Sequence, residues 1–215
     1  MRTVKSLALA LSPQCTILLL ALASMSCGCR TMNGYAMNET GTAYYRRGQY
    51  DLASNEFRRA VLDDPTNPNY QYNLATSLKR RGQVADAEKV YRRALDLDPA
   101  HQPSYHGLAM LLNEQNRRAD ANQLLESWAA TQPYASEPHI ETAWLHRETG
   151  DTASAERSLQ TALKIRPRHP VALAQLGQLY EEAGQPDRAV AMYQRSLHQR
   201  WNQPKVQTRL ASISR

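Results

Sequence analysis

The sequence has very little cysteine. Its three cysteines, Cys15, Cys27 and Cys29, all precede residue 30 of a chain of 215 residues. The later chain therefore has no disulfide framework and no zinc site built on thiolates. Phenylalanine occurs once and aromatic residues make up 7% of the chain, whereas alanine is abundant. A core poor in aromatic rings and rich in alanine favours closely packed helices over a β-sandwich.

The sequence also lacks a strong excess of one charge. The formal net charge is +6, but Arg2 and Lys5 lie in a leader, and the remaining chain carries 24 basic and 20 acidic residues. That excess is too small to predict a nucleic-acid partner. A glycine-rich phosphate loop, a nucleophile elbow and a Cys/His ligand cluster are all missing from the sequence. We therefore predict no catalytic residue, no cofactor and no metal site.

Residues 1–26 have the pattern of a secretory signal. Arg2 and Lys5 precede two apolar runs, small residues follow these runs, and the segment has no acidic residue. Three fates of this segment stay open. Ala21-Leu22-Ala23 offers a cleavage site, Ser24-Met25-Ser26-Cys27 resembles a lipobox, and a retained membrane anchor is the third alternative. Pro13 interrupts the apolar stretch and disfavours the anchor.

Cys27 is the residue that we expect to carry a lipid. The chain after residue 29 has no cysteine to pair with it, and Ser26 fits the lipobox, although Ser24 stands where leucine is usual. The resemblance to bacterial lipoproteins implies export and an anchor in the cell envelope, on the periplasmic side. Gly28 directly follows the cysteine, which favours the outer over the inner membrane. Residues 27–33 would then be a short tether.

From residue 34 onward, the same residue types recur every 34 positions. The recurrence gives five units without an insertion, at residues 34–67, 68–101, 102–135, 136–169 and 170–203. The recurring residues are prolines (Pro65, Pro99, Pro133 and Pro167), glycines with one asparagine (Gly48, Gly82, Asn116, Gly150 and Gly184) and alanines (Ala53, Ala87, Ala121, Ala155 and Ala189).

Each recurring residue type predicts a feature of a helical hairpin. The glycines mark the turn between two helices, where the backbone has a positive φ, and asparagine is the next-best residue for that conformation. The prolines end the second helix. Small first-helix residues (Gly41, Ala75, Ala109, Ala143 and Gly177) recur opposite large second-helix residues (Phe57, Tyr91, Leu125, Leu159 and Tyr193), as in interlocking helices.

This pattern resembles the tetratricopeptide repeat family over residues 34–203. The resemblance implies an all-α fold, a right-handed superhelical solenoid of five helical hairpins whose first helices line a concave groove. Residues 204–215 are expected to form a capping helix, with Val206, Leu210 and Ile213 on its apolar face. In architecture the chain resembles bacterial lipoproteins of this family, such as the pilotins of type IV pili.

The family's groove positions, carried over residue by residue, predict a protein-binding surface. Its members in this chain are Asn38, Thr42, Tyr45, Arg46, Tyr72, Asn73, Thr76, Lys79, Arg80, His106, Met110, Asn113, Glu114, Ile140, Glu141, Trp144, Arg147, Glu148, Gln178, Glu181 and Glu182. The groove would begin basic and end acidic, with Trp144 as an aromatic anchor. We expect a partner segment whose acidic part lies over units one and two. The alternative is that these charges only solvate the surface.

The predicted function is a non-catalytic scaffold or assembly factor that binds a protein partner. An adaptor for cell-wall enzymes is the alternative within the same class, and a nucleic-acid-binding or catalytic protein is the remote alternative from another class. A known mode of the family, the five-residue carboxylate clamp, is absent, because only Asn73 matches its pattern. His139 and His146 share a helix face, but the spacing lacks a further ligand, so packing is the better interpretation. A pH-responsive junction there stays open.

Overall fold

The computed structural model describes residues 33–213, and all of its regular secondary structure in that range is helical. The all-α prediction is therefore confirmed. Residues 33–46 are helical and precede the labelled helices. These are α2 (Tyr50–Asp63), α3 (Pro68–Arg80), α4 (Val84–Leu97), α5 (Gln102–Glu114), α6 (Arg118–Thr131), α7 (Glu137–Glu148), α8 (Thr152–Ile165), α9 (Pro170–Glu182), α10 (Pro186–Gln199) and α11 (Pro204–Ile213).

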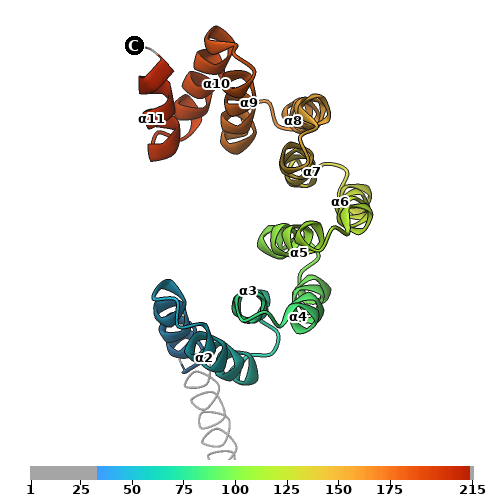
Figure 1. The fold of residues 1–215 in the computed structure, drawn as a ribbon, viewed down its shortest axis with the longest axis vertical. Coiled ribbons are helices and arrows are strands. Elements are labelled where there is room, and N and C mark those ends of the chain that lie inside the picture. The colour runs from blue at the N-terminus through green and yellow to red at the C-terminus, as the bar shows by residue number, and fades with distance from the viewer. Residues whose placement is uncertain (1–32, 214–215) are drawn as a thin grey trace, which may run out of the picture.

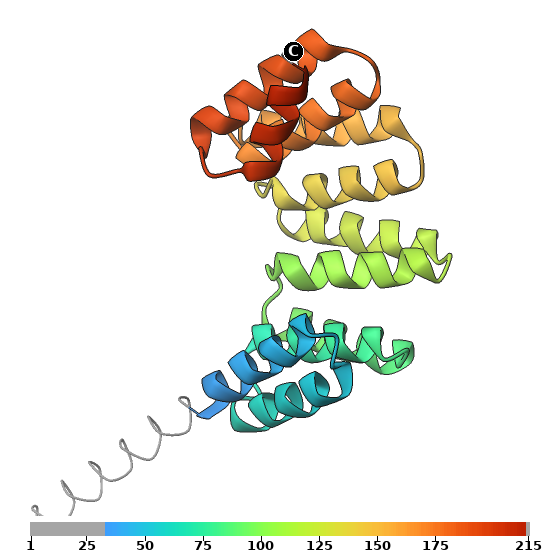
Figure 2. The same ribbon diagram turned by 60° about the vertical axis from the view of Figure 1, so that its left-hand side comes forward.

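The helices form hairpins that stack along an arc (Figures 1 and 2). Helix 33–46 pairs with α2, and each later hairpin joins an odd-numbered helix to the next even-numbered one. The first helices α3, α5 and α7 also contact across the units, α3 with α5 and α5 with α7. They lie toward the inside of the arc in Figure 1, whereas α4, α6 and α8 lie outside. The predicted solenoid, with first helices on the concave side, is thus the observed architecture.

The turn inside each hairpin follows the predicted backbone. Its φ angle is +74° at Gly48, +77° at Gly82, +80° at Gly150 and +68° at Gly184. Asn116 has φ +59° and, among the described residues, is the one non-glycine residue with a positive φ. The prediction that asparagine replaces glycine in this left-handed turn is confirmed.

The hairpins interlock because small residues face large ones. The five alanines that recur with the repeat, from Ala53 to Ala189, are 0% exposed. A Cβ atom added at Gly41 would lie 2.7 Å from the Phe57 ring, and one added at Gly177 would lie 2.7 Å from the Tyr193 ring. The glycines therefore let the two helices approach over an aromatic side chain.

The core consists of two clusters of buried residues that meet at α7. The first extends from unit one to Leu145, and the second begins at Ile140 and reaches Val206 of α11. Ile213 of α11 packs against the second cluster, so the predicted capping helix is present and covers the end of the stack.

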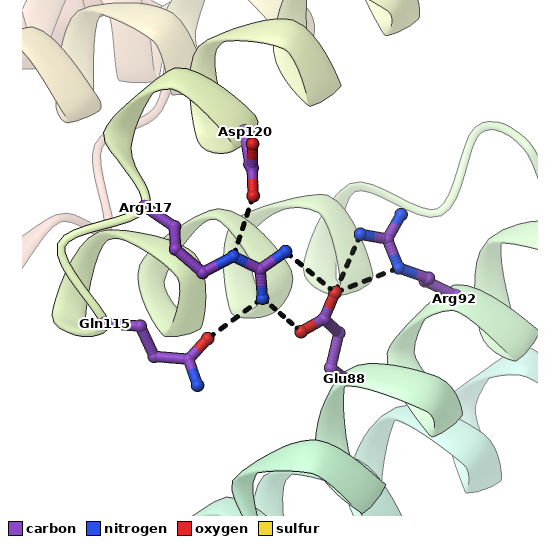
Figure 3. A network of polar contacts seen from close by, with 5 residues as sticks. All are labelled: Glu88, Arg92, Gln115, Arg117 and Asp120. Carbon is purple, nitrogen blue, oxygen red and sulfur yellow. Dashed lines mark hydrogen bonds and ion pairs between the residues drawn. The ribbon is translucent and has the colours of Figure 1, made fainter.

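Ion pairs on the outer side join successive hairpins. In the network of Figure 3, the Arg117 guanidinium donates to Glu88 of α4 over 2.6 Å and to Asp120 of α6 over 2.7 Å. Arg92 donates to the same Glu88 carboxylate over 2.8 Å. The hydrogen bond from Arg117 holds the pKa of Glu88 below its usual value. An analogous pair, Arg81 with Asp51 at 2.6 Å, joins units one and two.

Candidate functional site

The concave side of units one to three contains two hollows that share several residues. The larger hollow has a volume of 480 Å³ and the smaller one 220 Å³, and both are lined by Tyr45, Tyr72 and Thr76. Nine of the predicted groove residues line one or both hollows, namely Thr42, Tyr45, Tyr72, Asn73, Thr76, Lys79, Arg80, Met110 and Glu114. The structure thus brings together residues from three first helices that lie far apart in the sequence.

Tyrosine hydroxyl groups dominate the chemistry of the larger hollow. The Tyr91 hydroxyl lies 3.0 Å from the Thr76 hydroxyl, and its ring centroid lies 6.0 Å from that of Tyr72. Burial raises the pKa of Tyr91 well above its ordinary value, and burial likewise raises the pKa of Tyr45. Both phenols therefore remain protonated at neutral pH. Tyr91 is 1% exposed and its hydroxyl pairs with Thr76, whereas the half-buried Tyr45 can donate a hydrogen bond to a bound segment.

Two cations lie at the rim of the same hollow. The Lys79 ammonium group pairs with the Glu114 carboxylate of the next unit at 2.8 Å. The Arg80 guanidinium donates to the Tyr50 hydroxyl over 2.7 Å and lies 4.9 Å from the centre of that ring. The Lys79 side chain is 16% exposed and the Glu114 side chain 56% exposed, so solvent reaches the pair mainly from the carboxylate side.

Several predicted groove residues contact each other. Asn73 donates to the side-chain oxygen of Asn38 over 2.8 Å. Glu141 is 6% exposed. Its carboxylate accepts from Gln102 over 2.8 Å and lies 2.7 Å from Nδ1 of His106. These contacts join consecutive first helices, so they stabilise the stack as well as shape its surface.

The structure corrects one predicted contact residue. Ile140 is 1% exposed and belongs to the second core cluster. It cannot offer its side chain to a partner. The equivalent residues in units one and three, Asn38 and His106, contact the next first helix. In unit four the neighbouring residues cover Ile140 at this position.

The remaining predicted residues lie along the later part of the concave side, except for Arg46 on the helix of residues 33–46 and Asn113 on α5. Trp144 is partly exposed and contacts the His106 ring edge-on, with centroids 4.6 Å apart. Glu181 accepts from Tyr193 over 2.6 Å and from Arg209 of α11 over 2.8 Å. The others are exposed or half-exposed, namely Arg46, Asn113, Arg147, Glu148, Gln178 and Glu182. The Asn113 side-chain oxygen is buried and has no hydrogen-bond partner.

Sequence reasoning missed the contribution of the second helices to the hollow. Tyr91 and Phe57 belong to second helices, and Val84 begins one, yet all three line a hollow. A Cβ atom at Gly107 would lie 2.6 Å from the Tyr91 ring, so this glycine lets the ring reach the groove. The sequence feature that could have indicated this contribution is Gly107. It is a glycine at a repeat position where units two and four have the larger residues Asn73 and Glu141.

Within residues 33–213, no group of His, Cys, Asp and Glu side chains is arranged to hold a metal ion. His139 is half-buried, and burial lowers its pKa. The predicted signal at 1–26, the lipid attachment at Cys27 and most of the predicted tether lie outside the described residues. Asn33, the last tether residue, is already helical. Within the described range, no helix has the length and apolar character needed to cross a membrane.

Comparison with known proteins assigns this architecture to a family. Two tetratricopeptide repeat models match the sequence, one over residues 38–102 and the other over residues 78–139 and 146–213. No curated protein matches the sequence.

Solved structures also resemble the chain. TTC0263, a thermophilic tetratricopeptide repeat protein of Thermus thermophilus, has 25% identity and a TM-score of 0.62, covering 84% of this chain and 98% of its own. The pilF protein of Pseudomonas aeruginosa has 20% identity and a TM-score of 0.55, covering 86% of this chain and 85% of its own. PilW, a type IV pilus biogenesis factor, has 19% identity and a TM-score of 0.52, covering 77% of each chain.

Proposed function

Because this chain belongs to the tetratricopeptide repeat family, we propose that it is a non-catalytic scaffold that binds a segment of a partner protein in its concave groove. The observation that carries the proposal is the pair of hollows on the concave side of units one to three, which are lined by nine predicted groove residues. Concave surfaces lined by aromatic residues and cations are suited to anchoring side chains of a partner.

The partner segment is expected to be acidic where it crosses units one and two. Arg46 is exposed and, within the described part of the chain, has no ion-pair partner. Lys79 and Arg80 lie at the rim of the larger hollow. Carboxylates of the partner would pair with these cations, while the half-buried Tyr45 hydroxyl donates a hydrogen bond to its backbone.

We place this scaffold in the bacterial cell envelope, as an assembly factor on the periplasmic side with a lipid anchor at Cys27. The support is the signal-like pattern of residues 1–26 and the lipobox-like context of Cys27. The resemblance to pilF and to the pilus biogenesis factor PilW is consistent with such a role. Metabolic labelling with a fatty acid tests the anchor, because Cys27→Ser should abolish incorporation of the label.

Affinity capture with the full chain, followed by mass spectrometry, would identify the partner, and its purified form would then be tested for direct binding. The double substitution Arg46→Glu with Arg80→Glu should abolish this binding. A matched control with the same change in charge is Arg58→Glu with Arg93→Glu, since both residues are exposed on the second helices α2 and α4.

Equal binding by the groove variant and the wild type would refute the proposed groove. Equal losses in both double variants would show that net charge, rather than the groove, controls binding. The identity of the captured protein also separates the two envelope roles, because an adaptor would bring down a cell-wall enzyme and an assembly factor a component of the assembled machine.

A further inference from the structure

A second concavity lies at the C-terminal edge of the solenoid, apart from the groove. It has a volume of 810 Å³ and lies where α8 and α10 end and where α7 and α9 begin. Its charged lining residues are Glu137, Arg166, Arg168, His169 and Arg200. A neighbouring hollow of 480 Å³ shares Pro167 and Arg168 with it and adds Arg195 and His198. Three guanidinium groups thus line one hollow and a fourth lies beside it.

The repeat itself does not require cations at this edge. The residue that caps the C-terminal end of each second helix changes along the chain, as Asp64, Asp98, Gln132, Arg166 and Arg200. In unit one the Asp64 carboxylate accepts from the Thr66 N–H over 3.1 Å, so an acidic residue at this position stabilises the turn. A cation near a helix C-terminus gains from the helix dipole, but units one and two form the same turn without it.

The cations of this edge outnumber the available carboxylates. Glu137 is the one carboxylate that lines the hollow, and it pairs with Arg166 at 2.6 Å. Arg168 and Arg200 form no ion pair with any carboxylate of residues 33–213. Burial chiefly lowers the pKa of His169, the Glu137 carboxylate opposes that shift, and the positive charges of Arg166 and Arg200 add smaller contributions that lower it.

We propose that this hollow, which we call the arginine edge and define by Arg166, Arg168 and Arg200, binds a phosphate-bearing anion. Guanidinium groups pair with phosphate oxygens through paired N–H donors, and a phosphate would supply the negative charge that the edge lacks. This site is distinct from the two hollows of the proposed groove, because it shares no lining residue with them and lies at helix ends rather than along the first helices. The source of the phosphate is either a soluble compound or the headgroup of an anionic lipid.

The test is isothermal titration of the full chain with inorganic phosphate at constant ionic strength, so that general screening does not change. The double substitution Arg168→Glu with Arg200→Glu should weaken phosphate binding by more than about tenfold, since each charge-assisted hydrogen bond contributes strongly. The charge-matched control, Arg58→Glu with Arg93→Glu, should bind phosphate like the wild type. Circular dichroism of both variants establishes that each is folded.

A second measurement distinguishes the two sources. Vesicles of phosphatidylglycerol and phosphatidylcholine are compared with vesicles of phosphatidylcholine alone, for the wild type and both variants. If the arginine-edge variant alone loses anionic-vesicle binding, and inorganic phosphate competes with that binding, the anion is a lipid headgroup. If vesicle binding is the same in all three proteins while phosphate binding differs, the anion is soluble. The proposal is overturned if the wild type does not bind inorganic phosphate, or if both double variants lose binding equally.

Discussion

At the scale of single residues, two kinds of glycine have different physical roles, and substitution separates them. Gly150 has φ +80° and open space around a Cβ atom, so Gly150→Ala should cost about 1 kcal/mol through backbone strain alone. Gly177 lies against the Tyr193 ring, so crowding in Gly177→Ala should lower the free energy of unfolding by about 1 to 3 kcal/mol. The higher helix propensity of alanine offsets about 1 kcal/mol of this loss.

Unfolding in urea measures both effects, and a second substitution identifies their origin. Leu159 lies opposite Ala143 in unit four, so Tyr193→Leu should make room for alanine at position 177. Gly177→Ala is then expected to cost less in the Tyr193→Leu background than in the wild type, whereas Gly150→Ala should cost the same in both. Equal costs of Gly177→Ala in the two backgrounds would mean that crowding by the ring is not the cause.

Also at the residue scale, Glu114 occupies the position that a partner's carboxylate would take. It is the more exposed member of the pair with Lys79, so an incoming acidic residue competes with it. Glu114→Gln should strengthen binding of the captured partner by roughly two- to fivefold, the range for a partly exposed ion pair. Fluorescence anisotropy with the partner's acidic segment measures this gain. Weaker binding by the Gln variant would show that Glu114 itself contacts the partner.

At the scale of the elements, two histidines at helix N-caps make stability depend on pH. His101 occupies the N-cap position of α5, where its Nδ1 lies 2.8 Å from the Ser104 hydroxyl, and His169 caps α9 by accepting from the Ala172 N–H. Burial lowers the pKa of both imidazoles. A group whose pKa is lower in the folded than in the unfolded state takes up its proton more readily when unfolded. Its stabilising contribution is full above about pH 6.5, the unfolded value, and is lost as the pH falls toward the folded value.

The chain itself supplies the substitution that removes this dependence. Asn67 occupies the same repeat position in unit one, and its side chain accepts from the Asn69 N–H over 3.0 Å. His101→Asn with His169→Asn should therefore keep a polar N-cap residue on both helices while removing the part of the loss of stability between about pH 7.5 and about pH 5.5 that these two histidines cause. His139, whose pKa burial also lowers, keeps its own part. The exposed His198→Asn is the control. Urea midpoints at the two pH values give the result, and an unchanged difference would exclude the caps as its origin.

The elements were predictable because the repeat spacing fixes each turn, as Asn116 shows. The site was predictable only in part, because single positions do not reveal contacts between units. Ile140 occupies a groove position by repeat spacing, yet neighbouring helices bury it. Lys79 and Glu114 have opposite charges on different units, and only the curvature of the stack brings them to 2.8 Å. Tyr91 reaches the groove from a second helix because Gly107 leaves space.

At the scale of the whole molecule, the two core clusters should make the solenoid unfold in parts, since each unit contacts only its neighbours. Leu108 is 0% exposed in the first cluster and Leu176 is 4% exposed in the second, so either change to alanine should cost about 2 to 5 kcal/mol.

Leu176→Ala should raise amide hydrogen exchange from α7 onward and spare the helices before α6. Leu108→Ala should raise exchange in the helices before α7 and spare those after it. Both changes should affect α7, because its residues Leu145 and Ile140 belong to different clusters. Exchange measured by mass spectrometry would instead rise evenly in both variants if the stack were one cooperative unit.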